Sequence, residues 1–374
     1  MHLTLHLTNN CNLKCKYCFV KLGPERMSKE VALAAVKFGV ENSRQNHTTG
    51  ILFYGGEPLL ERKLIYDIAH HTQSIKEETG HNFYYKMTTN GLLLDEEFLK
   101  FAQGINLTIG FSHDGPAQDD CRLTPDGKGI GAILEKKIPL LLSYQPYAIG
   151  MSVLDPSVVH KGADIVAFLY EKGFRYITIN LNYNKGEPWT KKHLSILEKE
   201  YKKMAEMYIK WTKAETKFYL SPIDIKIVSH LKGKDYIPDR RKMAKNQLSV
   251  APDGLLYSSS RFVGTPELAI GDVFTGVDIE RQDFLTKKGE ALLDACCECA
   301  LVDRCNYSYD SISWDGTNIF TDIPAIQCVH EQMLTPIADR VAEKLYKERN
   351  ALFIHKHYND MYPVVSLVED RSTK

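Results

Sequence analysis

Three cysteines lie close together near the start of the chain, at Cys11, Cys15 and Cys18. They directly follow an alternating segment, Leu3–Leu7, which is typical of a β-strand. A four-iron cluster is usually held by four cysteine thiolates. Three thiolates on one short loop can hold three irons and leave the fourth iron open to a ligand that bears an amine and a carboxylate. A zinc loop without its fourth ligand, or three buried thiols, is the alternative.

A second group of cysteines lies late in the chain, which contains nine cysteines in all. We expect four of them to ligate a second metal centre: Cys296, Cys299, Cys305 and Cys328. Cys297 is too close to Cys299 for the usual ligand spacing and is predicted to be a bystander. Cys121 stands alone and is predicted to be a buried small hydrophobe.

Composition excludes several classes of protein. Lys+Arg and Asp+Glu are 47 each, so the formal net charge is zero, which excludes a generally basic nucleic-acid-binding protein. No apolar run reaches the roughly 18 residues of a membrane span, and Met1–Leu7 lacks the regions of a signal peptide. The sequence therefore predicts a cytoplasmic protein without a nucleic-acid or membrane partner. Its thiols are expected to remain reduced there.

Strand-like and helical segments alternate from residue 1 to about 185. The strand-like segments are Leu3–Leu7, Ile51–Tyr54, Phe83–Met87, Leu107–Ser112, Ile149–Leu154 and Tyr176–Leu181. Strands that alternate with helices imply parallel pairing through crossovers. Six units are too few for a closed eight-stranded barrel, so we predict an α/β fold with a partial (β/α)6 barrel. Polar segments after the strand ends would line one face of it.

The rest of the chain is predicted to form three further regions. After the barrel, at 1–185, come a helical connector at 186–242, a cysteine-bearing domain at 243–335, and a C-terminal helix and tail at 336–374. Within the third region, Gln247–Ala251 and Leu255–Tyr257 flank Pro252-Asp253-Gly254, which is typical of a hairpin turn. The tail from about Tyr358 carries little pattern and is expected to be mobile.

The first cysteine loop resembles the signature of the radical SAM superfamily, C-x3-C-x2-C after the first strand, with the aromatic Tyr17 before the last cysteine. In that superfamily the open iron of a [4Fe-4S] cluster binds the amino and carboxyl groups of S-adenosylmethionine (SAM). One electron then cleaves SAM to a 5'-deoxyadenosyl radical. The resemblance implies such a cluster on Cys11, Cys15 and Cys18, while the protein orients the reactants and excludes water.

Further segments stand where the superfamily places its SAM contacts, at the ends of successive strands. They comprise Gly55, Gly56, Glu57 and Pro58 after the second strand, Asn90 after the third, and Ser112 and Asp114 after the fourth. The resemblance implies that Glu57 pairs with the SAM ammonium. Arg122 resembles the arginine that follows the DGP segment in this branch, which implies a partner for the SAM carboxylate. Taken alone, Asn90-Gly91 and Asp114-Gly115 are typical of simple turns.

The late cysteines resemble a degenerate SPASM domain, the C-terminal domain of radical SAM enzymes that modify peptides and proteins. The hairpin is kept, but Ser259 stands where its cysteine is expected, and Tyr309 ends the C-x3-C element. The missing ligands are those of the first of two auxiliary clusters. The resemblance therefore implies one auxiliary [4Fe-4S] cluster on the four late cysteines, and two clusters in total. A four-cysteine zinc site is the alternative.

The resemblance implies an oxidoreductase-type enzyme that matures a ribosomally made peptide (RiPP). It would abstract hydrogen from carbon and form a thioether or carbon–carbon cross-link. A cluster with four thiolates has no free iron for substrate, but it could accept the electron that an oxidised product loses. The expected partners are a peptide or protein substrate and an electron donor such as flavodoxin or ferredoxin. Because the chain starts at the first barrel strand, a separate leader-binding protein is a further expected partner.

Three alternative functions stay open. An anaerobic sulfatase maturase, which oxidises Cys or Ser to formylglycine, suits the layout. That group, however, keeps both auxiliary clusters and places an Asp where this chain has Ser260. A small-molecule radical SAM dehydrogenase keeps the other auxiliary site. A binding or scaffold protein with relic clusters is the non-enzyme alternative, which SAM cleavage would exclude. The sequence does not identify a catalytic acid, base or radical relay.

Overall fold

The computed structural model describes residues 1–43, 47–183, 188–236, 246–291, 293–306 and 324–372. Within them, eleven strands form one sheet in the order β13-β12-β11-β10-β1-β3-β4-β5-β7-β8-β9. The strands are β1 His2–Thr8, β3 Thr48–Gly55, β4 Asn82–Thr89, β5 Thr108–Ser112, β7 Ile149–Leu154, β8 Tyr176–Leu181, β9 Tyr219–Ser221, β10 Gln247–Val250, β11 Leu255–Tyr257, β12 Ala269–Asp272 and β13 Gly276–Val277.

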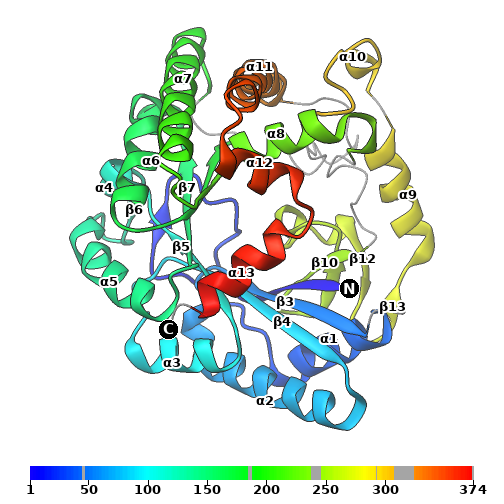
Figure 1. The fold of residues 1–374 in the computed structure, drawn as a ribbon. Coiled ribbons are helices and arrows are strands. Elements are labelled where there is room, and N and C mark those ends of the chain that lie inside the picture. Colours follow the sequence, from blue (N-terminus) through cyan, green and yellow to red (C-terminus); the bar gives the residue numbers. More distant parts are fainter. Residues whose placement is uncertain (44–46, 184–187, 237–245, 292, 307–323, 373–374) are drawn as a thin grey trace.

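Helices connect the parallel strands β1, β3, β4, β5, β7 and β8, so the predicted partial α/β barrel is confirmed. Figure 1 shows these helices around the outside of the strands. They are α1 Lys29–Glu41, α2 Arg62–Thr79, α3 Glu96–Gly104, α4 Gln118–Cys121, α5 Gly131–Tyr144 and α6 Gly162–Glu171. Ser28 caps α1 and Asp95 caps α3, since their side chains accept hydrogen bonds from Val31 N and Phe98 N.

The two faces of β1 differ in polarity. Leu3, Leu5 and Leu7 are fully buried in the apolar core, and Leu3 lies against Gly39 of α1. The alternate residues face the inside of the barrel because side chains alternate along a strand. On this inner face, the ring of His6 meets the ring of Tyr54 edge-on. The helices thus cover an apolar outer face, and the inner face is left for polar side chains.

The sheet extends beyond the six predicted strands. β9 pairs in parallel with β8, and β10 pairs in parallel with β1. The predicted hairpin is confirmed, since β10 and β11 are antiparallel with Ser249 opposite Tyr257. A partial barrel leaves two open strand edges, and extra strands satisfy their backbone groups. The hairpin is therefore continuous with the barrel sheet, and the predicted domain boundaries remain predictions.

The remaining helices pack over one side of the barrel and over the open part of the sheet (Figure 1). They are α7 Lys191–Lys213, α8 Ile223–Lys232, α9 Ile279–Glu290, α10 Asp294–Cys297, α11 Ala325–Lys347, α12 Ala351–Tyr358 and α13 Tyr362–Ser372. The tail, which carries little sequence pattern, forms α13. Tertiary contacts hold α13, because the backbone carbonyl of Ser366 accepts a hydrogen bond from Lys217 and its hydroxyl lies 3.1 Å from Tyr176 Oη.

Helix α12 is tied to the barrel through a buried carboxylate, Asp224 of α8. Asp224 accepts hydrogen bonds from Leu220 N at 2.7 Å and Tyr208 Oη at 2.6 Å, and it pairs with Lys356 of α12 at 2.6 Å. Lys356 also donates to Phe218 O at 2.8 Å. Burial lowers the pKa of Lys356, and the Asp224 charge opposes that shift.

No helix in the described ranges combines the length and apolarity that crossing a bilayer requires.

Replacing Asp224 with Asn should destabilise the protein by about 3–5 kcal/mol, because the Lys356 charge would stay buried without a counter-charge. Urea unfolding of the full chain measures this loss. The double variant with Asp224→Asn and Lys356→Met should lose less than the sum of the two single variants. Strictly additive losses would contradict a direct coupling of the two charges.

Candidate functional site

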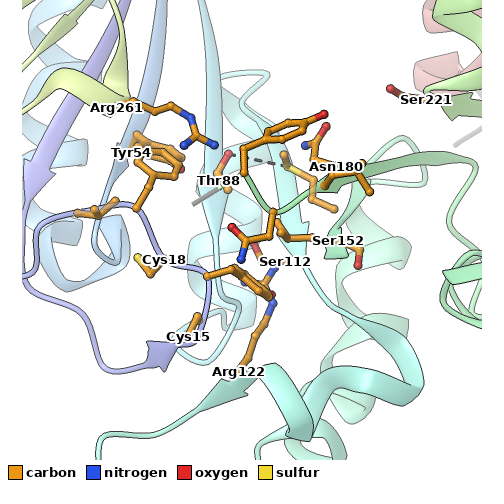
Figure 2. Close-up of a pocket in the computed structure, with 18 of the residues that line it drawn as sticks. Cys15, Cys18, Tyr54, Thr88, Ser112, Arg122, Ser152, Asn180, Ser221 and Arg261 are labelled. Atoms are coloured by element: carbon orange, nitrogen blue, oxygen red, sulfur yellow. Dashed lines mark hydrogen bonds between the residues drawn. The ribbon is translucent and has the colours of Figure 1, made fainter. Parts of the chain in front are cut away.

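A cavity of about 470 Å³ opens at the carboxyl ends of the parallel strands, which is where barrels of this kind place their sites. Residues at or near the carboxyl ends of β3, β4, β5, β7 and β8 line it, together with the first cysteine loop. Figure 2 shows Cys15 and Cys18 on one side and Ser152 and Asn180 on another, with Arg122 below them. A volume of this order suits a cofactor-sized molecule with part of a second ligand.

The three cysteines of the loop all line this cavity: Cys11, Cys15 and Cys18. A short antiparallel pair fixes the loop, β2 Lys14–Cys15 against β6 Arg122–Leu123. Burial, with smaller contributions from the charges of Glu57 and of the two other cysteines, raises the pKa of Cys11 to about 12. Burial also raises the pKa of Cys15 and of Cys18, which Arg122 opposes in both cases. The thiols are thus close together, and their thiolates need a positive partner.

Asp114 binds the loop to the barrel from behind the cavity. It is fully buried, and Tyr17 Oη donates a hydrogen bond to it. Arg122 Nε lies 3.0 Å from Asp114 Oδ2, while Ser152 Oγ and Val153 N donate to Oδ1 at 2.8 and 3.1 Å. The predicted DGP segment therefore positions Tyr17 and Arg122. Tyr17, Arg122 and Ser112 line the cavity, whereas Asp114 does not.

The Gly55-Gly56 pair lets two backbone segments approach each other. A Cβ at Gly55 would lie 2.3 Å from Thr8 O, and one at Gly56 would lie 2.1 Å from Asn10 O. Gly56 N donates to Thr8 O at 2.8 Å, and Glu57 N donates to Asn10 O at 2.9 Å. These glycines line the cavity, and their backbone also anchors the chain that enters Cys11.

Glu57 lies behind the cavity wall with its carboxylate turned toward the ends of β3 and β4. It accepts hydrogen bonds from Leu59 N at 3.0 Å, Thr89 Oγ1 at 2.7 Å and Asn90 N at 2.8 Å. Burial raises its pKa to about 7, which these hydrogen bonds oppose. Neither Glu57 nor Pro58 lines the cavity as described. The arrangement assigns Glu57 a role in joining two strand ends, and its expected contact with SAM stays a prediction.

Asn90 contacts the cysteine loop directly from the end of β4. Its Nδ2 donates to Asn12 Oδ1 at 2.7 Å and lies 3.8 Å from Cys11 Sγ. Its Oδ1 accepts from Leu92 N at 3.0 Å. Asn90 lines the cavity, as Ser112 does from the end of β5. Both predicted residues therefore lie beside the loop.

The late cysteines are gathered near the opposite wall. Burial raises the pKa of Cys328 on α11, and the charges of Cys296 and Cys299 raise it further, so these three thiols lie close together. Cys305 directly precedes Asn306, which lines the cavity. Cys297 is exposed. Cys121 is fully buried, as predicted, and Tyr309 lies outside the described residues.

Helices α8 and α11 supply a polar wall that faces the cysteine loop. Lys226 and Glu331 form a buried ion pair there, with side-chain exposures of 2% and 6%. Gln327 is also buried, and its Oε1 has no hydrogen-bond partner among the described residues. Tyr201 Oη lies 2.6 Å from His330 Nδ1. Glu331 is the one carboxylate among the described lining residues.

Sequence patterns did not predict this wall. Helical spacing was the signal available for part of it. Gln327, His330 and Glu331 have the i, i+3, i+4 spacing of one helix face, and they lie next to Cys328 in the sequence of α11. Ser152 and Asn180 were also missed, although both lie at or near the ends of predicted strands, where polar residues line the site.

The donor set of the first site fits a cluster that leaves one iron open. Three thiols converge on one cavity, and Tyr17 and Arg122 line the same cavity. Within the described ranges, no three His, Cys, Asp or Glu side chains are grouped tightly enough to hold a single metal ion. A bound [4Fe-4S] cluster would supply one-electron reduction of SAM. The surrounding residues would orient SAM and limit the access of water.

The raised pKa of Glu57 predicts a specific dependence of stability on pH. The unfolded carboxyl loses its proton near 4.5 and the folded one near 7, so the folded state binds more protons between these values. Its contribution therefore lowers the free energy of unfolding by about 3 kcal/mol as pH rises from 4.5 to beyond 7. Urea unfolding of the metal-free protein across this range should show the decline as a loss of stability of the wild type relative to Glu57→Gln.

Exposed Glu97→Gln is the matched control and should keep the wild-type profile. Titration of buried histidines changes both proteins alike, so the difference between wild type and Glu57→Gln isolates the carboxyl. A difference that does not vary with pH would contradict the raised pKa.

Replacing Asp114 with Asn should loosen the cysteine loop, because it removes the charge that holds Tyr17 and Arg122. With the four late cysteines changed to Ser, all bound iron belongs to the first site. In that background we expect iron retention against a chelator to fall about tenfold. Asp120→Asn, an exposed neighbour paired with Lys161, should leave it unchanged. Equal retention in both variants would show that the loop keeps its shape without this carboxylate.

Residues 5–135 match the model of the Radical SAM superfamily. A serine-type anaerobic sulfatase-maturating enzyme from Bacteroides thetaiotaomicron is 22% identical over 328 residues, which cover 79% of each chain. An uncharacterized protein from Methanocaldococcus jannaschii is 28% identical over 200 residues, which cover 52% of this chain and 66% of that protein. The first of these relatives is matched over most of its length.

Two solved structures share the fold. The anaerobic sulfatase-maturating enzyme anSMEcpe with bound AdoMet and the Cp18Cys peptide matches with a TM-score of 0.77 and 19% identity, over 93% of this chain and 99% of that one. SuiB from Streptococcus suis, bound to its precursor peptide SuiA, matches with a TM-score of 0.58 and 15% identity, over 86% and 74%. Residues 5–135, which carry the cysteine loop at the end of β1, place this part of the chain in the radical SAM superfamily, and the two solved structures show that their fold extends over most of the chain.

Proposed function

We propose that this chain is a radical SAM maturase that modifies a peptide or protein by abstracting hydrogen from carbon. The observation that carries the proposal is one cavity with two cysteine groups beside it. Cys11, Cys15 and Cys18 line one wall, while Asn306 and Gln327, neighbours of Cys305 and Cys328, line another. A substrate in this cavity would lie between a radical source and an electron acceptor.

The first site would hold SAM on the open iron of its [4Fe-4S] cluster. The chemistry the bound pair supplies is a 5'-deoxyadenosyl radical. Arg122 is suited to the SAM carboxylate because its guanidinium lines the cavity while Asp114 holds Nε and Nη2 from behind. Asn90 and Ser112 supply polar groups beside the same loop.

The second site would hold an auxiliary [4Fe-4S] cluster on Cys296, Cys299, Cys305 and Cys328. Four thiolates would leave no iron open to substrate, so its suited role is to accept an electron from an oxidised product. The closeness of Cys328 to Cys296 and Cys299 supports this ligand set. A four-cysteine zinc site remains the alternative.

A peptide is the substrate class that fits the surroundings best. Two solved structures with the same fold contain bound peptides, Cp18Cys and SuiA. The wall made by α8 and α11 offers amide, imidazole and paired charged groups, which suit the polar backbone of a peptide. An electron donor such as flavodoxin or ferredoxin and a separate leader-binding protein are the further proposed partners.

The bond we propose is a thioether or carbon–carbon cross-link in a ribosomally made peptide. Formylglycine formation is the second candidate, and the curated sulfatase-maturating relative favours it. Against it, Ser260 occupies the position of the expected Asp, and its hydroxyl lies 2.9 Å from that of Ser249. A small-molecule dehydrogenation is a third candidate. The two solved structures with this fold that contain bound peptides argue against it.

The first test is SAM cleavage by the anaerobically reconstituted protein with a chemical reductant. We expect 5'-deoxyadenosine from the wild type and at least about a hundredfold less from the Cys11, Cys15 and Cys18 triple Ala variant, which lacks the reducing cluster. Chromatography of the nucleoside products measures both. An iron-loaded wild type that releases no 5'-deoxyadenosine would contradict the proposal.

The product then separates the two peptide chemistries. Peptides encoded beside the gene should gain a cross-link that resists reduction and appears as linked fragments in tandem mass spectrometry. A formylglycine product would instead react with a hydrazide reagent. Labelling by the hydrazide without linked fragments would replace cross-linking with formylglycine formation.

A further inference from the structure

The loop that carries Cys299 and Cys305 is fixed by protein contacts that need no metal. Backbone turns shape it, with Cys299 N donating to Cys296 O at 3.1 Å and Val302 N donating to Cys299 O at 3.1 Å. Arg304 N closes the next turn on Leu301 O at 2.9 Å. The loop then reaches Cys305, and the side chain before it makes the main tertiary contact.

The Arg304 side chain forms hydrogen bonds with two helices, α8 and α11. Its Nη1 and Nη2 donate to the two carboxylate oxygens of Asp339 on α11, at 2.9 and 2.6 Å. Its Nε donates to Ser229 Oγ on α8 at 3.2 Å, and Nη2 also donates to Lys226 O at 3.3 Å. His230 Nδ1 lies 3.3 Å from the same Asp339 carboxylate. Three groups on two helices, the Asp339 carboxylate, Ser229 Oγ and Lys226 O, therefore determine where the guanidinium lies.

This ion pair has the geometry of a strong one. Its side chains are 19% and 22% exposed, so solvent screens the charges less than at the surface. Two parallel N–H···O bonds add directionality that a lysine could not reproduce. Exposed single-contact pairs, by contrast, contribute little. The contact is thus strong enough to fix a short loop.

The Arg304–Asp339 ion pair is called the clamp below. Helix α11, which carries Asp339, also carries one of the late cysteines. Cys328 and Asp339 both belong to α11, about three turns apart, so their separation is set by the helix itself. Fixing Arg304 on Asp339 therefore fixes Cys305 relative to Cys328. Tyr236 Oη donates to Asn306 Oδ1 at 2.6 Å and holds the other side of Cys305.

We propose that Arg304 and Asp339 are a positioning pair that pre-forms the metal site of the four late cysteines. The inference rests on the proposed auxiliary site and adds residues that sequence spacing does not reveal. Without the clamp, the loop would have to be ordered by the metal itself, and that cost would be taken from the binding free energy.

The test uses the full chain with Cys11, Cys15 and Cys18 changed to Ala, so that any retained metal belongs to the late site. The protein is reconstituted anaerobically with iron and sulfide, and separately with zinc, then challenged with a chelator. We expect about four irons in this background. Asp339→Asn and Arg304→Lys should each retain about tenfold less metal at equal chelator.

The matched control is Glu343→Gln, an exposed carboxylate one turn further along α11, which should retain metal like the background. A second background, with the four late cysteines changed to Ser, reports the first site alone, and Asp339→Asn should leave its iron unchanged. Arg304→Lys keeps the charge and tests the fork geometry should Asp339→Asn fail to fold.

Three outcomes would overturn the inference. The clamp variants could retain metal like the control, or Asp339→Asn could lose metal equally in both backgrounds, as a general destabilisation would. The background could also hold neither iron nor zinc, which would remove the auxiliary site from the proposed function as well. SAM cleavage by the wild type tests the remainder of that function separately.

Discussion

The buried carboxylate of Asp114 is the interaction on which the geometry of the first site depends. It joins the cysteine loop through Tyr17, the segment after α4 through Arg122, and β7 through Ser152 and Val153. A buried charge is tolerated only when a counter-charge and hydrogen bonds satisfy it. Asp114 has both, and its backbone N–H donates to Gln118 Oε1. The loop therefore has a fixed shape before any metal binds.

The opposite flank of the loop is held by backbone contacts instead of charge. Gly55 and Gly56 allow β3 to end against the strand that leads into Cys11, and Glu57 joins that end to β4. The loop is thus pinned from two sides with its thiols toward the cavity. Burial keeps those thiols protonated in the metal-free protein, so assembly of the cluster must release protons. The rigid loop lowers the entropic cost of ordering the chain when the cluster binds. Burial of the thiols raises the free energy needed to deprotonate them.

The barrel and the cysteine loop could be predicted because both are local patterns, one of apolar periodicity and one of spacing. The added strand β9 could not, and neither could the pairing of β10 with β1, since the place of a short strand in a sheet is defined by its pairing partners. A motif also shows that a polar side chain follows a strand without showing which way it points. The motifs therefore did not show that the side chains of Glu57 and Asp114 turn behind the cavity wall. Gln327 and Glu331 were missed because their place in the cavity depends on how α11 packs, far along the chain from the barrel.

The two ends of the C-terminal region are held by different chemistry, which bears on how many clusters this chain uses. At the end of the β10–β11 hairpin, Ser259 accepts from Arg261 N at 3.2 Å, and Ser260 lies 2.9 Å from Ser249. Hydrogen bonds close that turn where a SPASM domain would use a thiolate. Around Cys305, the Arg304–Asp339 pair and Tyr236 keep the loop in place beside its thiol. Polar contacts close the hairpin turn at Ser259 and also hold the loop around Cys305, which agrees with the single auxiliary centre that we propose.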